Sequence, residues 1–497
     1  MAARAFPSLV AAAALVLASA PSAAAQAGPP GCTGDTEADA VAQLPGPRLR
    51  FGVNPRAVTG QIGPLPAPAV PEDPERHLAK LGELRPPGAP FALRLTRFFW
   101  SDGEEAFRRF LEMTEHYTSR GYLVELQVRY HPSDRQEGDI PAWVRHVREV
   151  VSRFGVNPRV IGLQIANEVN IAFSPDSSDG SYEGAREALV QGVVAAKDEA
   201  RRRGYDQLRI GFNWAYRTDP ASETSFWQAL RDRGGPEFVR SLDFIGLDAY
   251  PGTVFPPAEG GIDDYRDGMV NAMSAIRCYA TIPGIPASVP IEIGENGWPT
   301  TAGRSYTDQA DILRTMVRAA HDFRGTYNVT DYRWFNLRDS QTGAPGVFQN
   351  AGLLEDDYDE KPAFAAYRQL VSELTVSPAA PPQAGPRRPR LGLRLRFRAG
   401  RTASGRRCAS GPVRATVAGR DRRSARRATF FRDGRRVARD RRRPLSRVID
   451  RRPRGSRVRL HRARVGVRLA DGRLVRLVRR YRACARPLAL AAFRRSP

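Results

Sequence analysis

VIGLQIANE, residues 160–168, is an apolar run that ends in the polar pair Asn167-Glu168. A second apolar run, IEIGENGWP at residues 291–299, carries Glu295 ahead of its Gly-Trp-Pro end. Short, continuous apolar runs are typical of parallel strands that are covered on both faces. We therefore predict two buried strands, each of which presents a glutamate at its carboxyl end.

Further runs of this kind alternate with stretches of helical periodicity between residues 49 and 375, which predicts a parallel α/β domain. About 325 residues over eight units is about 41 per unit, which favours a closed (β/α)8 (TIM) barrel over an open sheet. Glu168 and Glu295 then lie about three units apart, on the fourth and seventh strands. The expected strands are Leu49–Asn54, Phe91–Phe98, Leu123–Tyr130, Val160–Asn167, Leu208–Trp214, Phe244–Tyr250, Ile291–Glu295 and Tyr332–Leu337.

Two carboxylates at one rim of a barrel are the pair that retaining glycoside hydrolysis requires. Glu168 is the predicted general acid/base, with a proton affinity raised by the negative nucleophile beside it. Glu295 is the predicted nucleophile and must stay ionised. The plainer interpretation of Glu168 is a solvated loop carboxylate. Glu292 competes with Glu295 by residue type, but strand alternation points it to the opposite face.

The two motifs together resemble the signatures of the large clan of (β/α)8 retaining glycoside hydrolases. In that clan the acid/base follows an Asn at the end of strand four, and the nucleophile ends strand seven. The forms at 166–169 and 295–299 are especially similar to the endo-β-1,3-glucanases, and the second also to cellulase-like and xylosidase-like branches. Over residues 49–375 the resemblance implies a hydrolase that cleaves a β-linked oligo- or polysaccharide with retention. A glucan-remodelling transglycosylase and a wall-binding protein with little activity are the alternatives.

Three further residues are expected to support the glutamates. The Asn167 amide is placed to hydrogen-bond a sugar 2-hydroxyl, a contact that strengthens in the transition state. Arg97, at the end of the second strand, is the predicted cation for Glu295, because Arg94 lies further inside the strand. The clan resemblance implies that Tyr250 donates its phenolic proton to the same carboxylate.

Other side chains near the strand ends are candidates for binding sugars. The resemblance places a stacking platform at Trp334, because an indole covers the apolar face of a sugar ring; the alternative is a core tryptophan. Trp298 is a candidate for a further subsite, and His131 for contact with a substrate hydroxyl or for a structural role. Asn213 and Asp248 are weaker candidates, and Asp248 equally fits a hydrogen-bond acceptor at the barrel rim.

No metal or cofactor is expected. The six histidines lack ligand spacing, the acidic residues show no calcium-loop pattern, and no glycine-rich phosphate loop follows a strand.

The N-terminus predicts export. Residues 1–25 combine Arg4, an apolar stretch at Leu9–Ala20 and a small-residue run, as a signal peptide does. Residues 26–48 form an extension before the barrel. No later stretch is long and apolar enough to span a membrane. We therefore expect a secreted protein, extracellular or associated with the cell wall.

Four cysteines in an exported chain permit two disulfides. Cys408 and Cys484 bracket one small domain and are the predicted pair. Cys32 with Cys278 is the remaining pairing, although Cys278 equally fits a buried thiol on a barrel helix.

The net charge of +24 hides a division of the chain into an acidic and a basic part. Residues 386–497 hold 39 Arg and five Asp without Lys or Glu, whereas the rest has more acidic than basic residues. A proline-rich linker at 376–390 separates the two parts, and 488–497 form a tail. Alternation and two Asp-Gly turns, at 433–434 and 471–472, predict a small immunoglobulin-like sandwich over 391–487.

The arginine-rich sandwich suits a polyanion such as an anionic cell-wall polymer. A charged spacer is the plainer interpretation. Specific nucleic-acid recognition is not expected, because the sequence shows no recognised reading module.

Overall fold

The computed structural model describes most of both parts of the chain. The described residues are 32, 36, 38–55, 69–175, 177–217, 219–255, 262–375, 391–402, 406–451, 459–470 and 474–485. The expected signal peptide, linker and C-terminal tail lie outside these residues.

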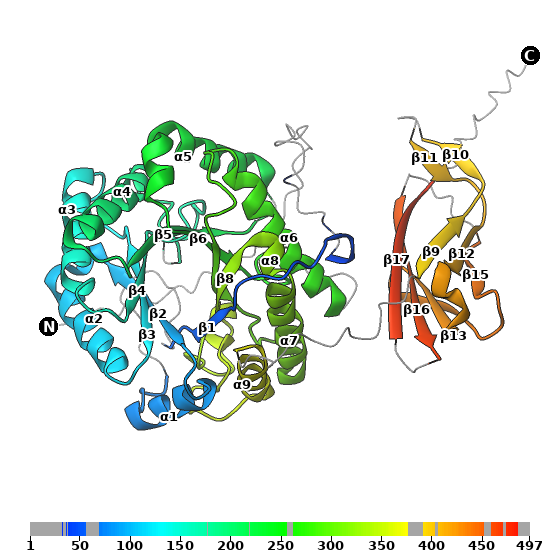
Figure 1. Ribbon diagram of the computed structural model, residues 1–497, viewed down its shortest axis with the longest axis horizontal. Coiled ribbons are helices and arrows are strands. Elements are labelled where there is room, and N and C mark those ends of the chain that lie inside the picture. Colours follow the sequence, from blue (N-terminus) through cyan, green and yellow to red (C-terminus); the bar gives the residue numbers. More distant parts are fainter. Residues whose placement is uncertain are drawn as a thin grey trace, which may run out of the picture.

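Eight parallel strands close into a barrel, each paired with the next along the chain and the first with the last (Figure 1). The predicted TIM barrel is therefore confirmed. Its strands are β1 (Arg50–Val53), β2 (Ala92–Phe99), β3 (Leu123–Arg129), β4 (Val160–Ile165), β5 (Arg209–Ala215), β6 (Phe244–Ala249), β7 (Ile291–Asn296) and β8 (Val329–Trp334).

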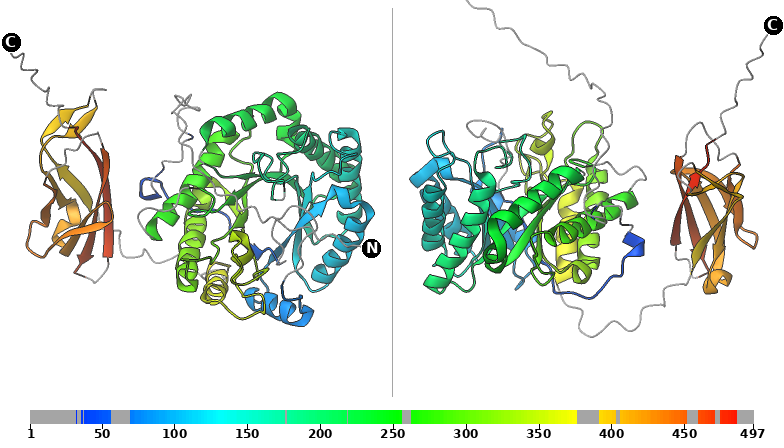
Figure 2. Two further views of the ribbon diagram at one scale, coloured as in Figure 1. Left: turned by 180° about the vertical axis from the view of Figure 1, so that it is seen from behind. Right: turned by 90° about the horizontal axis from the view of Figure 1, so that it is seen from above.

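Helices surround the barrel and cover the outward faces of the strands (Figures 1 and 2). They are α1 (Pro74–Leu84), α2 (Gly103–Thr118), α3 (Ile140–Phe154), α4 (Ala185–Arg203), α5 (Pro220–Ser241), α6 (Ile262–Ala280), α7 (Tyr306–Asp322), α8 (Arg324–Tyr327) and α9 (Pro362–Thr375). Helix α3 shows the pattern: Asp139 caps its first turn, and Trp143, Val147 and Val150 are buried against the core. None of the described helices has the length and apolarity that a membrane crossing requires.

Strand β8 begins three residues before its expected start. The first part of this strand carries a charged residue. Asp331 is buried inside the barrel and accepts hydrogen bonds from Arg50 (2.7 Å) and Arg333 (2.7 Å). Glu292 also enters this cluster and pairs with Arg209. Burial and the neighbouring Asp331 charge raise the pKa of Glu292 to about 8.

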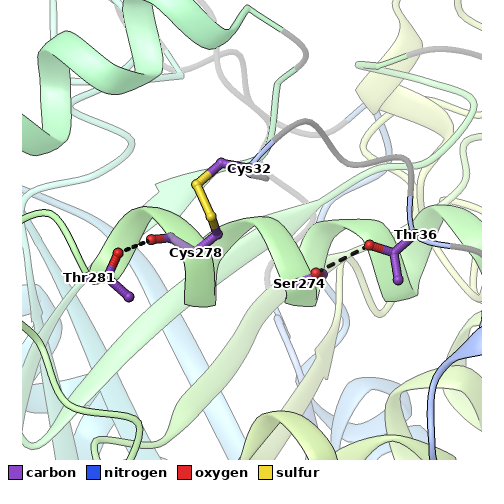
Figure 3. The surroundings of a disulfide bond; sticks show 5 residues. All are labelled: Cys32, Thr36, Ser274, Cys278 and Thr281. Carbon is purple, nitrogen blue, oxygen red and sulfur yellow. Dashed lines mark hydrogen bonds between the residues drawn. A yellow bond between two sulfur atoms is a disulfide. The ribbon is translucent and has the colours of Figure 1, made fainter. Parts of the chain in front are cut away.

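A disulfide ties the N-terminal extension to helix α6 (Figure 3). Cys32 and Cys278 have their Cα atoms 5.3 Å apart, and Thr36 donates to Ser274 on the same helix (3.3 Å). The Ala38 N–H donates to Asp267 (3.1 Å). The Cys32–Cys278 pairing, which the sequence left open, is therefore present.

Removing this disulfide should destabilise the barrel. The bond closes a loop with a sequence separation of 246, so the reduced unfolded chain gains much conformational freedom. We expect the C32S/C278S variant to lose about 2–4 kcal/mol of unfolding free energy. Denaturant unfolding of the oxidised and reduced wild type, beside the variant, checks this. An unchanged midpoint in the variant would show that the bond contributes nothing.

The C-terminal domain consists of two sheets that pack as layers (Figure 2). The six-stranded sheet has the order β10-β11-β17-β16-β13-β14, and the three-stranded sheet the order β15-β12-β9. The strands are β9 (Gly392–Arg396), β10 (Ala399–Arg401), β11 (Arg407–Ala409), β12 (Val413–Ala418), β13 (Ala425–Arg432), β14 (Arg435–Asp440), β15 (Ser446–Asp450), β16 (Arg459–Leu469) and β17 (Leu474–Ala483). The predicted small all-β domain is thus confirmed.

Two sequence signals of this domain are also found. The first Asp-Gly turn joins β13 to β14, with Asp433 (φ 47°) and Gly434 (φ 77°) both left-handed, as a tight hairpin requires. The second Asp-Gly pair lies outside the described residues. Cys408 and Cys484 form the expected disulfide, with Cα atoms 5.1 Å apart.

Candidate active site

The end of β4 is held in an unusual backbone conformation. Ala166 (φ 59°) and Glu168 (φ 45°) are both left-handed, which residues with a Cβ rarely adopt. Buried side chains hold this turn: the Asn167 N–H donates to Asp179 (2.8 Å) and the Glu168 N–H to Asn213 (2.8 Å). Strain that is maintained in this way is common at functional sites. The turn delivers the Glu168 side chain to the cleft.

The Asn167 side chain is tied to the protein. Its oxygen accepts from Gln127 (2.7 Å) and Asn213 (2.8 Å), and its nitrogen donates to the Ser177 carbonyl (2.6 Å). Asn167 also lines the cleft. Its amide is therefore fixed in place before any substrate arrives.

Three donors converge on the Glu295 carboxylate. Tyr250 donates at 2.8 Å, the hydrogen bond that the resemblance implies, and Gln127 and Arg94 approach at 3.4 Å each. Gly294 allows the Arg94 guanidinium to pack against the strand, because a Cβ there would lie 2.9 Å from Arg94 Nη1. These contacts hold the Glu295 carboxylate in one orientation and place a positive charge beside it.

Arg94 is a cation that the structure places beside Glu295, at 3.4 Å, although Arg97 was the predicted one. The pairing of β2 with β3 shifts register between Leu95 and Phe98, and Arg97 has φ 70°. This bulge leaves Arg94 aimed at Glu295, while Arg97 lines the cleft.

Glu168 faces Glu295 across the cleft. Oxygens of Glu168, Glu295 and a third carboxylate, Asp248, lie within 4.8 Å of one another, and all three residues are buried. Burial, and then the Glu295 charge, raise the pKa of Glu168 to about 8. The site therefore holds one carboxyl, Glu168, that keeps its proton at neutral pH.

This pKa predicts how activity depends on pH. Glu168 is the predicted proton donor, and a donor works only while it is protonated, so a pKa of about 8 would keep it competent at neutral pH. We expect kcat/KM to fall as pH rises through about 8, and the pKa of Glu168 to drop in E295Q, where the neighbouring charge is gone. A pH–rate profile, and NMR titration of Glu168 in both proteins, measure this. A basic limb near the ordinary glutamate pKa would contradict the assignment.

Asp248 is the third carboxylate of the site, and the sequence marked it only as a weaker candidate. One oxygen accepts from Asn213 and the other has no hydrogen-bond partner among the described residues. Burial and Glu295 raise its pKa. The three carboxylates are the one described group close enough for a shared cation, but Arg94 already lies 3.9 Å from Asp248 and 3.4 Å from Glu295.

The cleft between these groups has a volume of about 250 Å³ and an aromatic wall. Tyr250, Phe335 and Phe348 meet edge to face beside Glu295. Phe173, 74% exposed, lines the mouth. None of the three phenylalanines was among the predicted residues.

Three predicted contact residues lie outside the cleft lining. Trp334 is fully buried in the core, so its predicted stacking role is wrong; the next residue, Phe335, presents the ring instead. Trp298 is buried and donates to Tyr265 (3.0 Å). His131 stacks on Phe99, with ring centroids 4.3 Å apart.

No family model matches the chain, and no curated protein matches it. Several solved structures align with it. A GH5_18 protein from Streptomyces cattleya in complex with GlcNAc is 15% identical, with a TM-score of 0.45, over 70% of this chain and 83% of its own. A beta-glucosidase from Exiguobacterium marinum is 14% identical, with a TM-score of 0.44, over 60% and 86%.

Bacteroides uniformis beta-glucuronidase 2 is also 14% identical, with a TM-score of 0.42, over 89% of this chain but 46% of its own. The chain therefore spans about half the length of that protein. Because these similarities are low, the chemistry of this chain rests on its own site.

Proposed function

We propose that the barrel is a retaining glycoside hydrolase that acts on a β-linked glycan, with Glu168 as acid/base and Glu295 as nucleophile. The observation that carries this is the approach of the two carboxylates to within 4.8 Å in one cleft. Carboxyl groups about 5 Å apart suit double displacement, whereas inverting pairs stand about 6.5–9.5 Å apart to admit a water.

In the first step the Glu295 oxygen attacks the anomeric carbon, and the bond to the leaving oxygen breaks. Glu168 gives its proton to that oxygen, which departs as an alcohol. Tyr250 donates to one oxygen of Glu295 and Arg94 to the other, and together they keep the attacking carboxylate oriented. The product of this step is a glycosyl ester on Glu295.

In the second step Glu168, now ionised, removes a proton from a water molecule. The resulting oxygen nucleophile attacks the anomeric carbon, and Glu295 leaves as a carboxylate. Two inversions give net retention. Loss of the Glu295 charge in the ester lowers the proton affinity of Glu168 at the moment when it must act as a base.

A substrate panel tests the proposal. Wild type and E295Q are purified in parallel and incubated with aryl α- and β-glycosides and with β-glucans. We expect wild type to cleave at least one β-linked substrate and E295Q to cleave none. Equal rates for both proteins, or cleavage confined to α-linked substrates, would overturn it.

We also infer that the protein acts outside the cytoplasm and that its C-terminal domain binds an anionic polymer of the cell wall. Two disulfides support the first point, because such bonds form in oxidising compartments. The excess of arginine in the C-terminal domain supports the second.

A further inference from the structure

The outer face of the three-stranded sheet forms a groove of about 790 Å³, which we name the arginine groove. Strands β9, β12 and β15 form its floor, and the segments before β13 and β15 contribute to its end. Its polar and charged lining residues are Arg394, Arg396, Arg414, Thr416, Arg422, Arg442, Arg443, Ser446 and Arg447.

Strand alternation places these arginines outside. Leu393, Ala415 and Val417 face the core and are buried, so the residues between them point to solvent. The register then sets arginine beside arginine: Arg414 pairs with Arg396 across the two strands. Opposed residues of this kind have Cβ atoms about 5 Å apart.

The groove holds positive charge that the described part of the chain does not neutralise. Arg394, Arg396 and Arg414 are exposed and form no ion pair with any described residue. Arg447 is the exception, because it pairs with Asp440 at 2.9 Å. Like charges directly across a ladder destabilise a sheet, so an anion placed between these strands would relieve the repulsion.

The remaining lining narrows the chemistry of the ligand. Thr416 and Ser446 lie opposite each other, with their hydroxyl oxygens 2.8 Å apart, in the row beside Arg414. Hydroxyls next to guanidinium forks suit a sugar that carries carboxylate or phosphate groups. The described lining contains no aromatic ring on which a nucleic-acid base could stack.

We propose that the arginine groove binds a linear anionic polysaccharide, with Arg394, Arg396 and Arg414 as the anion contacts and Thr416 and Ser446 as sugar contacts. This inference rests on the polymer-binding role proposed above and is independent of hydrolysis by the barrel. Its consequence is that catalysis takes place on glycans next to acidic polymer.

A binding experiment with two matched triple variants of the full chain tests the groove. R394Q/R396Q/R414Q removes the groove contacts. R435Q/R436Q/R439Q removes three exposed arginines from β14, in the other sheet. The probes are polygalacturonate, teichoic acid, neutral dextran and single-stranded DNA, measured over a range of salt concentrations. Circular dichroism confirms that each variant is folded.

We expect the groove variant to lose about tenfold or more in affinity for polygalacturonate or teichoic acid, with a shallower salt dependence, and the β14 variant to lose much less. The two anionic probes separate carboxylate from phosphate as the preferred group. R394K/R396K/R414K should restore part of the affinity, because lysine keeps the charge but not the planar fork.

Equal losses of affinity in both triple variants would show that diffuse positive charge binds the polymer, and would overturn the proposal of a specific site in the arginine groove. Tighter binding of DNA than of either acidic glycan, with the same arginine dependence, would also overturn it. If the wild-type chain bound neither glycan, the polymer-binding role itself would fail. Cleavage of small aryl glycosides should be unchanged in every variant, so these failures remain distinct from failure of the catalytic proposal.

Discussion

Replacing Glu295 with alanine will reduce kcat by a factor on the order of 10⁴ or more, because it removes the carboxylate that we propose forms the glycosyl ester. Added azide or formate will restore part of the activity, since a small anion fits the space of the missing carboxylate. The rescued glycosyl azide will have inverted configuration, because only one displacement then occurs. Steady-state kinetics and NMR of the product measure both effects.

Glu112→Ala is the matched control for this change. Glu112 lies on α2, and its side chain is 65% exposed, so its removal should leave turnover unchanged. A Glu295→Ala enzyme that kept most of the wild-type activity would remove Glu295 from the mechanism. Such a result would leave Asp248, another carboxylate of the cleft, as the next residue to test.

Replacing Glu168 with alanine will have an effect that depends on the leaving group. Loss of general acid catalysis will lower kcat/KM about 10²–10⁴-fold for substrates with an alcohol leaving group. An aryl glycoside that releases a stable phenolate needs no proton, so its first step will be almost unaffected. Deglycosylation will become slow, and a burst of phenolate will precede the steady state.

The comparison of the two leaving groups contains its own control. A purely structural role for Glu168 would lower both activities by the same factor. Equal losses would therefore contradict its assignment as the acid, whereas a large difference would support it. Azide should accelerate the slow second step and give a glycosyl azide of retained configuration, opposite to the product from Glu295→Ala.

The fold could be predicted because parallel strands buried on both faces leave continuous apolar runs, and β4 shows this clearly. The pattern failed at the start of β8. Asp331 is buried there as an ion pair with Arg333, and a hydrophobicity pattern cannot tell a buried ion pair from a loop.

The candidate site could be predicted only as far as the strand ends. Which arginine reaches Glu295 depends on the bulge in β2, which leaves Arg94 beside Glu295 and places Arg97 in the cleft lining. The choice between Trp334 and Phe335 likewise depends on where β8 ends. Sequence patterns indicate which strand end carries a site residue. A shift of one residue along the strand, however, changes which side chain faces the cleft.

Partners from distant strands were harder still to foresee. Gln127 joins Asn167 to Glu295 from β3, yet a glutamine within an apolar run has no distinctive signal. Asp179, which holds the turn after β4, lies in a loop whose path the sequence does not show. Both act through contacts that exist only once the barrel has closed.

The stereochemistry of the first product tests the central claim most directly. With a β-glycoside that the enzyme cleaves, proton NMR during the first minutes records which anomer forms before mutarotation. Two carboxylates within 4.8 Å predict that the β-anomer appears first. Initial release of the α-anomer would mean a single displacement by water and would contradict covalent capture by Glu295.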